Sequence, residues 1–454
     1  MKKILIPILC ILSISAVNAQ TLQTSYFSED FAYSYRLNPA FHPKTGFVGL
    51  PFIGSTGVGY KGNFAINDLF YKVGGERVTF INDAVPSSEF LGHFKDGPAR
   101  FGTESYSNLF AIGFKAGGMY NIVDVNIRSY SSGWFPSDFM RFLKDGAVSD
   151  GTYDLSGLRA HSMSLADIGI TSSWKLTRKL RIGMRFKGVF GLNNSYIDMD
   201  RMNIRHTGND WSVTADGVIA SAYDGYDIKT APAPFDPTVE LIDFRKTVFG
   251  KPKGVMNGFG VGADIGFLYD DSSWQLSASV SDIGCVFWFH NLYGHSPSQA
   301  LEYSTEYQPH HHGGTRVDNE FSDMGALLGD AFGFLKEDEY QSLVLLPLTL
   351  RLGAQYLYLS DLSFGGLATF RYDPIRPFWD IRGNVNYRPV KKVELIGSLG
   401  MGSMGVTAGA FANVRLGSLS IFAGTDNLLG SSISTFYPSG KGTPNFAAGL
   451  NIIW

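Results

Sequence analysis

Apolar and polar residues alternate through long stretches of the chain. In RIGMRFKGVFGL (residues 181–192), the large apolar side chains take even positions, whereas Arg181, Arg185 and Lys187 take odd ones. Successive side chains of a β-strand point to opposite faces, so this pattern predicts a strand with one apolar and one polar face. The same division recurs in residues 258–269, 350–356, 362–371, 379–388 and 406–416.

The alternation continues to the C-terminal residue. In NFAAGLNIIW, one parity carries Phe446, Ala448, Leu450, Ile452 and Trp454. This pattern predicts a last strand with an apolar face that no later segment covers. Lipid would cover such a face, and pairing with the first strand would complete the sheet.

A membrane protein with this pattern has few architectures open to it. The chain after residue 19 has no run of the ~18 apolar residues that a membrane-spanning helix needs. In lipid every backbone N–H and C=O must be paired, which leaves the closed barrel. A secreted β-sandwich also alternates, but its strands are rarely so rich in glycine. We therefore predict an all-β fold, a transmembrane antiparallel β-barrel with short helical insertions.

Composition and the N-terminus support export. The chain has 53 Gly, 35 Phe and 22 Tyr, only 17% charged residues, and a formal net charge of −3, which argues against nucleic-acid binding. Lys2 and Lys3 precede an apolar run and the small residues Val17 and Ala19, so residues 1–19 are predicted to be a secretory signal peptide. Only Cys285 remains after its removal, which excludes an intrachain disulfide framework.

Several short motifs carry a family resemblance. SYRLNPAFHPKTGFVGLP (residues 34–51) contains Asn38-Pro39-Ala40, which resembles FadL-type barrels. Together with SVSDIG (279–284) and GTDNLLG (424–430), the sequence resembles a Bacteroidota family of FadL- and PorV-like outer-membrane proteins of undefined function. The resemblance implies a barrel of about 14 strands. It also implies an N-terminal plug with Asn38, Pro39 and Ala40 as its motif, and passage of hydrophobic molecules.

The end of the chain carries a second resemblance. A last strand that ends in an aromatic residue looks like the signal that outer-membrane barrels present to the barrel assembly machinery. The resemblance assigns that signal to Phe446, Leu450, Ile452 and Trp454.

The expected organisation is a signal peptide (1–19), a plug segment (20–45) and a barrel (46–454). Insertions are predicted at about 65–108, 134–160, 224–256 and 286–346. PSSEFLGHFKDG (86–97) and WFPSDFMRFLKDG (134–146) predict short amphipathic helices. A helical face in the last insertion would pack on the barrel or act as a lid over a hydrophobic ligand.

Motifs for catalysis or cofactors are weak. GMGSMG (400–405) matches G-x-G-x-x-G but precedes an alternating stretch, which favours a hairpin turn over dinucleotide binding. His310, His311 and His312 precede two glycines and favour a loop over a metal site. No Gly-x-Ser-x-Gly elbow is present. We expect no enzymatic activity, no cofactor and no metal.

Basic residues dominate the predicted lumen face. They outnumber Asp264, Asp380 and Glu394 on that parity, although the whole chain is acidic. Either acidic loops or the plug segment pair with them, or they attract an anionic solute or a fatty-acid carboxylate. The candidate lumen charges are Arg181, Arg185, Lys187, Arg351, Arg371, Arg382, Arg388 and Arg415.

Three functions fit this barrel. FadL-like transport of hydrophobic or amphipathic small molecules, the favoured one, predicts an interior apolar pocket with a lateral or plug opening. A general porin predicts a continuous polar pore. A PorV-like secretion or surface-assembly partner predicts a sealed barrel with a protein-binding rim.

The first prediction concerns location. Protein that begins near Gln20 should appear in the outer-membrane fraction and migrate differently on a gel before and after heating, because closed barrels resist unfolding in detergent. Recovery as a soluble periplasmic protein would contradict the barrel.

The second prediction concerns assembly. Deletion of Trp454 or the substitution Ile452→Lys should reduce the amount of heat-modifiable barrel much more than His311→Ala, because only the first two alter the lipid face of the last strand. Equal losses would argue against the proposed signal.

Overall fold

The computed structural model describes residues 22–303 and 333–454, except 65, 96, 147–150, 208–209, 234–236, 244–246, 250–253, 255, 298–299, 338–339, 373–376, 404, 429–431, 434–436 and 439–444. The predicted signal peptide and the three consecutive histidines lie outside the described residues. Within the described part, no helix is long and apolar enough to cross a membrane.

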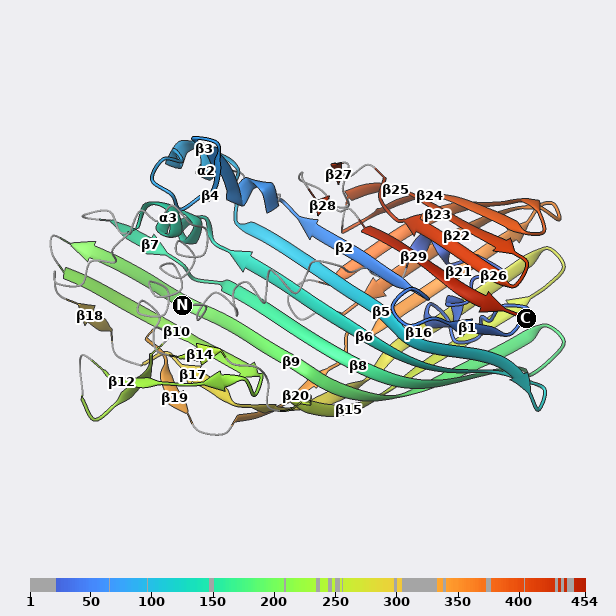
Figure 1. Ribbon diagram of the computed structural model, residues 1–454, viewed down its shortest axis with the longest axis horizontal. Coiled ribbons are helices and arrows are strands. Elements are labelled where there is room, and N and C mark those ends of the chain that lie inside the picture. The colour runs from blue at the N-terminus through green and yellow to red at the C-terminus, as the bar shows by residue number, and fades with distance from the viewer. Residues whose placement is uncertain are drawn as a thin grey trace.

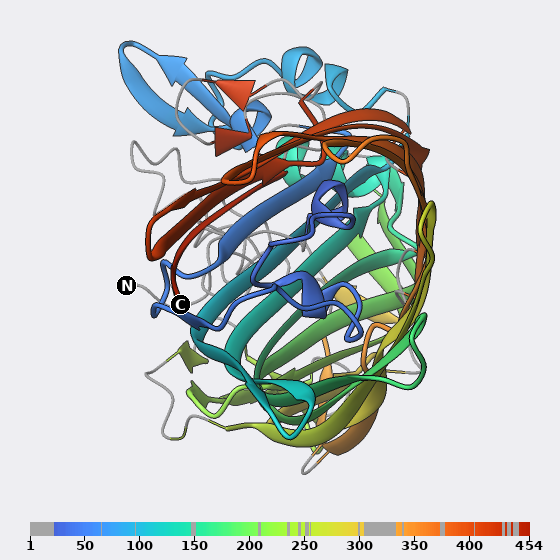
Figure 2. The ribbon, with the colours of Figure 1, turned by 90° about the vertical axis from the view of Figure 1, so that its right-hand side faces the viewer.

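The protein is a closed antiparallel barrel of 14 strands, as the alternation predicted (Figures 1 and 2). Going round the ring, its strands are β1 (Phe47–Gly49) in line with β2 (Thr56–Gly62), β5 (Ala99–Ala116), β6 (Met119–Phe135), β8 (Leu158–Lys175), β9 (Leu180–Thr207), β15 (Gly258–Asp270), β16 (Trp274–His290), β21 (Thr349–Leu357), β22 (Leu362–Arg371), β23 (Phe378–Val390), β24 (Val393–Gly402), β25 (Gly405–Leu416), β26 (Leu419–Thr425) and β29 (Asn445–Ile453).

The remaining elements are short, apart from β10 with its 13 residues. They are the 3-10 helices η2 (Gln23–Ser25), η3 (Ser34–Arg36) and η4 (Ile66–Leu69), the helices α2 (Ser87–Gly92) and α3 (Ser137–Asp145), and the strands β3 (Phe70–Val73), β4 (Glu76–Thr79), β7 (Thr152–Asp154), β10 (Asp210–Ala222), β11 (Tyr226–Asp227), β12 (Thr230–Pro232), β13 (Glu240–Ile242), β14 (Val248–Phe249), β17 (Leu292–His295), β18 (Leu301–Tyr303), β19 (Leu335–Glu337), β20 (Tyr340–Leu345), β27 (Ser432–Ile433) and β28 (Tyr437–Pro438).

The first and last strands close the ring. Phe47 of β1 is paired with Ile453 of β29, and Thr56 of β2 is paired with Ala448. On its other side β29 pairs with β26, so both edges of the last strand are hydrogen-bonded. The expectation that the last strand pairs with the first is therefore confirmed.

Side-chain burial follows the predicted parity. On β23, Ile381 is 62% exposed whereas its neighbours Asp380 and Arg382 are 2% and 1% exposed. The same alternation of exposed apolar and buried polar residues runs along β21 and β22. The apolar face points away from the lumen, toward lipid, and the polar face points inward.

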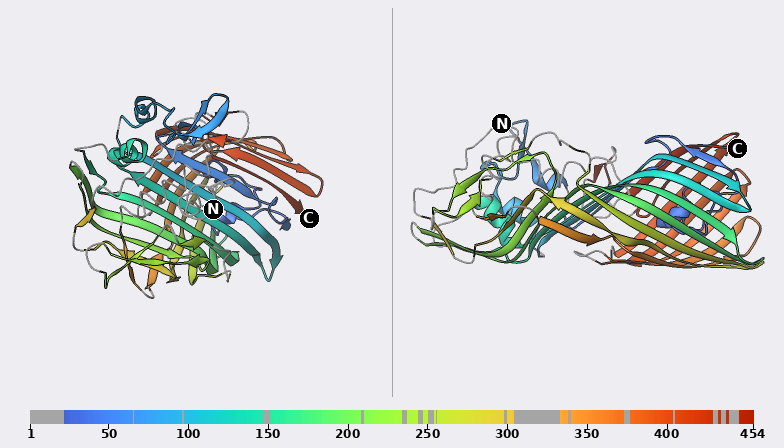
Figure 3. Two further views of the ribbon diagram at one scale, coloured as in Figure 1. Left: turned by 60° about the vertical axis from the view of Figure 1, so that its left-hand side comes forward. Right: turned by 90° about the horizontal axis from the view of Figure 1, so that it is seen from below.

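The two ends of the barrel differ. At one end, here called the turn end, short turns at 117–118, 176–179, 271–273, 358–361, 391–392 and 417–418 join neighbouring strands. At the opposite loop end, β5, β6, β8 and β9 continue well beyond the shorter strands, and β9 has 28 residues against nine in β29 (Figures 1 and 3). A strand needs only about 9–11 residues to cross a bilayer.

The strand extensions carry a second apolar core at the loop end. Helices α2 and α3 lie over them (Figure 1). The buried members of this core include Phe80, Phe90, Phe139, Phe142, Tyr153, Met199, Met202 and Ile204. We call this unit the canopy; it comprises the described residues 63–64, 66–95, 97–98, 136–146 and 151–158 together with the loop ends of β8, β9 and β10.

The insertions differ in detail from the sequence prediction. The two short helices are present, and the GMGSMG stretch is a hairpin turn between β24 and β25, as predicted. However, β5 begins at Ala99, inside the predicted 65–108 insertion, and β16 reaches His290. The first residues of β5, ARFGTESYSN, contain few apolar side chains, and the last residues of β16, VFWFH, are apolar on both parities, so neither stretch alternates clearly. Most of the helical face predicted in the last insertion lies outside the described residues, but Leu335, the last residue of that predicted face, lies in β19.

Candidate functional site

The N-terminal segment, residues 22–45, lies inside the turn end of the barrel (Figure 2). Two strand carboxylates hold its first part. Asp426 accepts hydrogen bonds from the backbone N–H groups of Gln23 (3.0 Å) and Thr24 (2.7 Å). Glu394 accepts from the backbone N–H of Glu29 (3.1 Å) and from the hydroxyl of Ser28.

The second part of the segment contacts β29, β5, β6 and β16. The Tyr33 hydroxyl lies 2.8 Å from Oδ1 of Asn451 on β29 and 3.1 Å from Oδ1 of Asn108 on β5, so it bridges the closing strands from inside. The Tyr35 hydroxyl donates to Asp124 at 2.8 Å. Leu37 O accepts from the Ser279 hydroxyl at 2.9 Å.

The predicted plug motif lies against β9, β15 and β16. Asn38 Nδ2 donates to Phe267 O (3.1 Å), while Asn38 Oδ1 accepts from the backbone N–H of Ala40 (2.9 Å) in a local turn. The wall has glycine where the motif touches it: a Cβ on Gly183 would meet the backbone of Pro39, and one on Gly266 would meet Asn38. Glycine is therefore required for this close approach.

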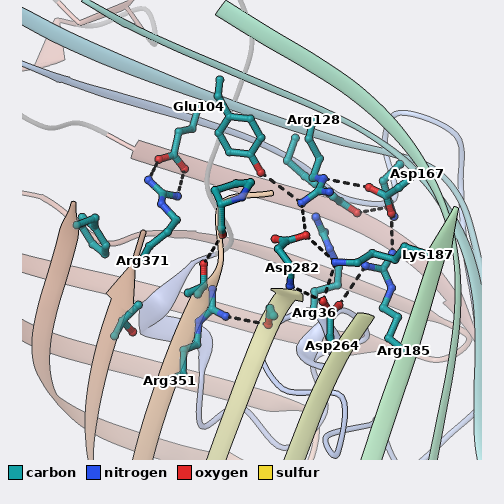
Figure 4. A pocket seen from close by; sticks show the side chains of 18 of the residues that line it. Arg36, Glu104, Arg128, Asp167, Arg185, Lys187, Asp264, Asp282, Arg351 and Arg371 are labelled. Carbon is teal, nitrogen blue, oxygen red and sulfur yellow. Dashed lines mark hydrogen bonds and ion pairs between the residues drawn. The ribbon is translucent and has the colours of Figure 1, made fainter. Parts of the chain in front are cut away.

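A buried ion-pair network lies next to the segment, toward the loop end (Figure 4). Its basic members are Arg128, Arg185 and Lys187, and its acidic members are Asp124, Asp167, Asp264 and Asp282. Lys187 Nζ lies 2.6 Å from Oδ1 of Asp264 and 2.6 Å from Oδ1 of Asp282. Because each cation contacts at least two carboxylates, the charges compensate one another away from water.

Asp282 reaches this network through an unusual backbone conformation. Its φ is +62°, and the β15–β16 register shifts between Ala263 and Ile265, opposite this point. The resulting bulge also places the Asp282 N–H 2.7 Å from Oδ1 of Asp264. A positive φ is an unfavourable backbone conformation for a residue other than glycine. At Asp282 this conformation places the carboxylate between Arg128 and Lys187.

The predicted lumen charges all belong to inward-facing strand positions, and most have acidic partners. Arg382 contacts Asp380 at 3.1 Å, and Arg371 contacts Glu104. The N-terminal segment supplies two partners: Glu29 pairs with Arg388 (2.5 Å) and Asp30 pairs with Arg415 (2.8 Å). Burial opposes ionisation of Glu29, but Lys44 and Arg388 lower the pKa of its carboxyl group.

Arg181 and Arg351 have no carboxylate partner among the described residues. Arg181 donates to Ala40 O at 3.4 Å. Arg351, only 6% exposed, reaches Leu37 O at 3.5 Å and the Ser281 hydroxyl at 3.4 Å. Together with Arg36, whose guanidinium lies over the Tyr106 ring, Arg351 borders a cavity of about 80 Å³ beside the network (Figure 4).

An apolar layer follows the network toward the loop end. It consists of Met163, Leu165, Val189, Val286, Trp288 and Leu346, all facing inward. Trp288 is fully buried, and the Cβ-free positions Gly191 and Gly258 leave room for its indole. Inward apolar residues at this depth depart from the polar lumen that the sequence predicted.

Sequence reasoning missed four of the seven network residues: Asp124, Arg128, Asp167 and Asp282. Asp124 and Arg128 lie in YNIVDVNIRSY, where alternation is present but apolar residues also occur on the inward parity. Asp282 lies in the quoted SVSDIG motif, but only the bulge reveals its direction. The proposed assembly-signal residues share the outward parity, with Ile452 40% and Trp454 60% exposed, and Phe446 and Leu450 half-buried.

Residues 39–426 match the sequence model of DUF5723, a protein family of unknown function. The chain belongs to DUF5723. No curated protein matches this DUF5723 chain.

Solved structures similar to this DUF5723 protein share little sequence identity with it. The toluene transporter TbuX of Ralstonia pickettii has a TM-score of 0.44 at 9% identity, with 96% of this chain and 95% of that chain covered. The Pseudomonas putida toluene transporter TodX has a TM-score of 0.42 at 9% identity, with 97% of this chain and 95% of that chain covered. A Pseudomonas aeruginosa FadL homologue has a TM-score of 0.43 at 10% identity, with 96% of this chain and 99% of that chain covered.

The network predicts a large effect of one lysine. Lys187→Met should leave Asp264 and Asp282 facing each other without their shared cation and cost about 3–5 kcal/mol of folding free energy. Urea unfolding in lipid vesicles measures this loss. The matched control is Lys179→Met, which removes an exposed pair with Asp271 and should change the unfolding midpoint little. A similar loss in both variants would contradict the importance of the buried network.

Proposed function

We propose that this DUF5723 protein is an outer-membrane barrel that transports hydrophobic or amphipathic small molecules in the manner of FadL-type proteins. The observation that carries the proposal is the inward-facing apolar layer around Trp288. A water-filled pore needs a polar lumen, and an apolar constriction hinders ions by excluding water. Apolar solutes do not meet that obstacle.

The layers follow one another along single strands. On β9, Met199 and Met202 belong to the canopy core, Val189 to the apolar layer, Arg185 and Lys187 to the network, and Gly183 contacts Pro39. A molecule that enters from the loop end would therefore meet apolar surface first and charge second. This order suits an amphipathic molecule that enters with its apolar part in apolar surroundings and ends with its polar group near the charges.

The polar end of such a molecule has a candidate partner in the cavity beside the network. Arg351 is buried there without a carboxylate partner among the described residues, and Arg36 lies close by. A volume of about 80 Å³ admits a carboxylate group but not an acyl chain. Charge-assisted hydrogen bonds from guanidinium groups are the usual means of holding a carboxylate.

Residues 20–45 would act as the plug, with Asn38, Pro39 and Ala40 fixing its bend. Pro39 restricts its own φ and keeps Asn38 away from helical conformations. The contacts of Asn38 with Phe267 O and with the Ala40 N–H favour a single conformation of this turn. Opening of the lumen would require the turn at Asn38-Pro39-Ala40 to move away from Gly183 and Gly266.

Location and partners complete the proposal. Short turns at one end and long extensions at the other are typical of outer-membrane barrels, in which the turns face the periplasm. Membrane lipid would cover the outward apolar face, and the assembly machinery would recognise Phe446, Leu450, Ile452 and Trp454. The transporter would need no cofactor, would bind no nucleic acid and would catalyse no reaction.

A sealed barrel with a PorV-like role in secretion or surface assembly is the second candidate. The observation that favours it is the turn end, where the N-terminal segment and the network lie inside the barrel beside a small charged cavity. A general porin is less favoured, because the apolar layer interrupts a polar path.

The test displaces the plug and measures two kinds of passage. Gly266→Ala places a methyl group at Asn38 and should push the turn out of position, whereas Gly366→Ala adds a methyl group in open space and serves as the control. Ion conductance in planar bilayers should rise only in Gly266→Ala, and uptake of a fluorescent fatty acid by cells should change with it. All proteins should first show heat modifiability.

Each outcome points to one function. Fatty-acid uptake by the wild-type protein without steady ion conductance supports transport. Open-pore conductance in the wild-type protein would favour the porin. No uptake and no conductance in either protein would favour the sealed barrel.

A further inference from the structure

The turn end carries exposed basic residues. Lys115 and Lys175 end β5 and β8, and Arg178 lies in the following turn. Lys391 and Lys392 form the turn between β23 and β24. No acidic side chain of the described residues pairs with any of these five. Since the whole chain has a net charge of −3, the basic turn end is not a consequence of a basic composition.

The acids near this end do not cancel the exposed charges. Glu29 and Asp30 pair with Arg388 and Arg415 at the inner rim. Asp271 pairs with Lys179 at 2.9 Å. Asp270 and Asp361 lie at the same end without an ion pair among the described residues, but the five basic residues outnumber them, so the rim carries a net positive charge.

An aromatic belt fixes the depth of these charges. Trp274 and Tyr356 lie on neighbouring strands with ring centroids 5.0 Å apart, and both are exposed on the outward face beside their turns. Tyr269, Tyr387 and Trp454 lie at the same end and are also exposed. Tryptophan and tyrosine rings mark the level of lipid headgroups, so the basic turns just beyond them lie at or outside that level.

We propose that the turn end binds anionic phospholipid headgroups of the leaflet it faces, through two basic clusters: Lys115, Lys175 and Arg178, and Lys391 and Lys392. The proposal rests on the membrane location proposed above but not on transport. Lysine and arginine near a membrane surface attract anionic lipid, and the attraction falls within a Debye length.

The arrangement favours lipid over an acidic protein partner. The turns of β8–β9 and β23–β24 are on nearly opposite sides of the ring, so one compact acidic surface would not engage both clusters easily. Lipid surrounds the barrel and reaches both. Each cluster also adjoins exposed apolar side chains, Leu176 in one and Val390 in the other, which suits a molecule with a charged head and an apolar tail.

Native mass spectrometry of the full-length protein in detergent tests this inference. The protein is titrated with dioleoyl phosphatidylglycerol or with dioleoyl phosphatidylcholine, and bound lipids are counted. The wild-type protein should bind the anionic lipid at least about threefold more tightly than the zwitterionic one. The variant Lys175→Gln/Arg178→Gln/Lys391→Gln/Lys392→Gln should lose most of that preference.

A charge-matched control separates location from net charge. Lys72, Arg77, Lys95 and Arg205 are exposed basic residues at the loop end, and their joint replacement by Gln should leave the preference unchanged. Equal lipid preference in the turn-end variant and the wild type overturns the proposal, and so does an equal loss in both variants. If the four-residue variant of the turn end folds poorly, the double variant Lys391→Gln/Lys392→Gln should still lose a clear part of the preference for anionic lipid. An unchanged preference in that pair also counts against the proposal.

Discussion

The requirement that every backbone hydrogen-bonding group be paired in lipid governs this structure. It is met where β29 pairs with β1 and β2, because that contact removes the last free edges of the sheet. Once the sheet is closed, strand geometry sends alternate side chains outward to lipid and inward to a confined space. The inward residues must then satisfy one another, and the ion pairs of Lys187 with Asp264 and Asp282 are the result.

The N-terminal segment solves the same problem at the turn end. Asp426 and Glu394 point inward from β26–β29 and β24, and without the segment they would lack several of their hydrogen bonds. The segment in turn brings its own acids, Glu29 and Asp30, to Arg388 and Arg415. Barrel and segment thus supply partners for each other, which explains why a largely polar interior is compatible with a nearly filled lumen.

The sequence predicted the features that depend on the two-residue repeat of a β-strand. The strand pattern, the apolar face that ends in Trp454 and the inward direction of residues such as Arg382 all follow from that repeat. It did not predict which strands face each other across the lumen, because residues such as Glu104 of β5 and Arg371 of β22 meet only when the ring closes. It also missed Asp282, whose direction depends on a local bulge, and the Trp288 layer, which depends on Gly191 and Gly258. The strand ends of β5 and β16 were missed for a different reason, since the first has few apolar side chains and the second is apolar on both parities.

The hydrogen bonds between Thr24 and Asp426 have a consequence for folding. They join residues separated by 402 positions, so almost the whole chain must be in place before they form. Native contacts between such distant parts of a chain slow folding, because the entropy of the intervening chain is lost before the contact contributes. The same contacts would be among the last to form and would contribute little in the transition state for folding. Their main effect would then be to slow unfolding, giving the inserted protein a long lifetime rather than a fast route to its native state.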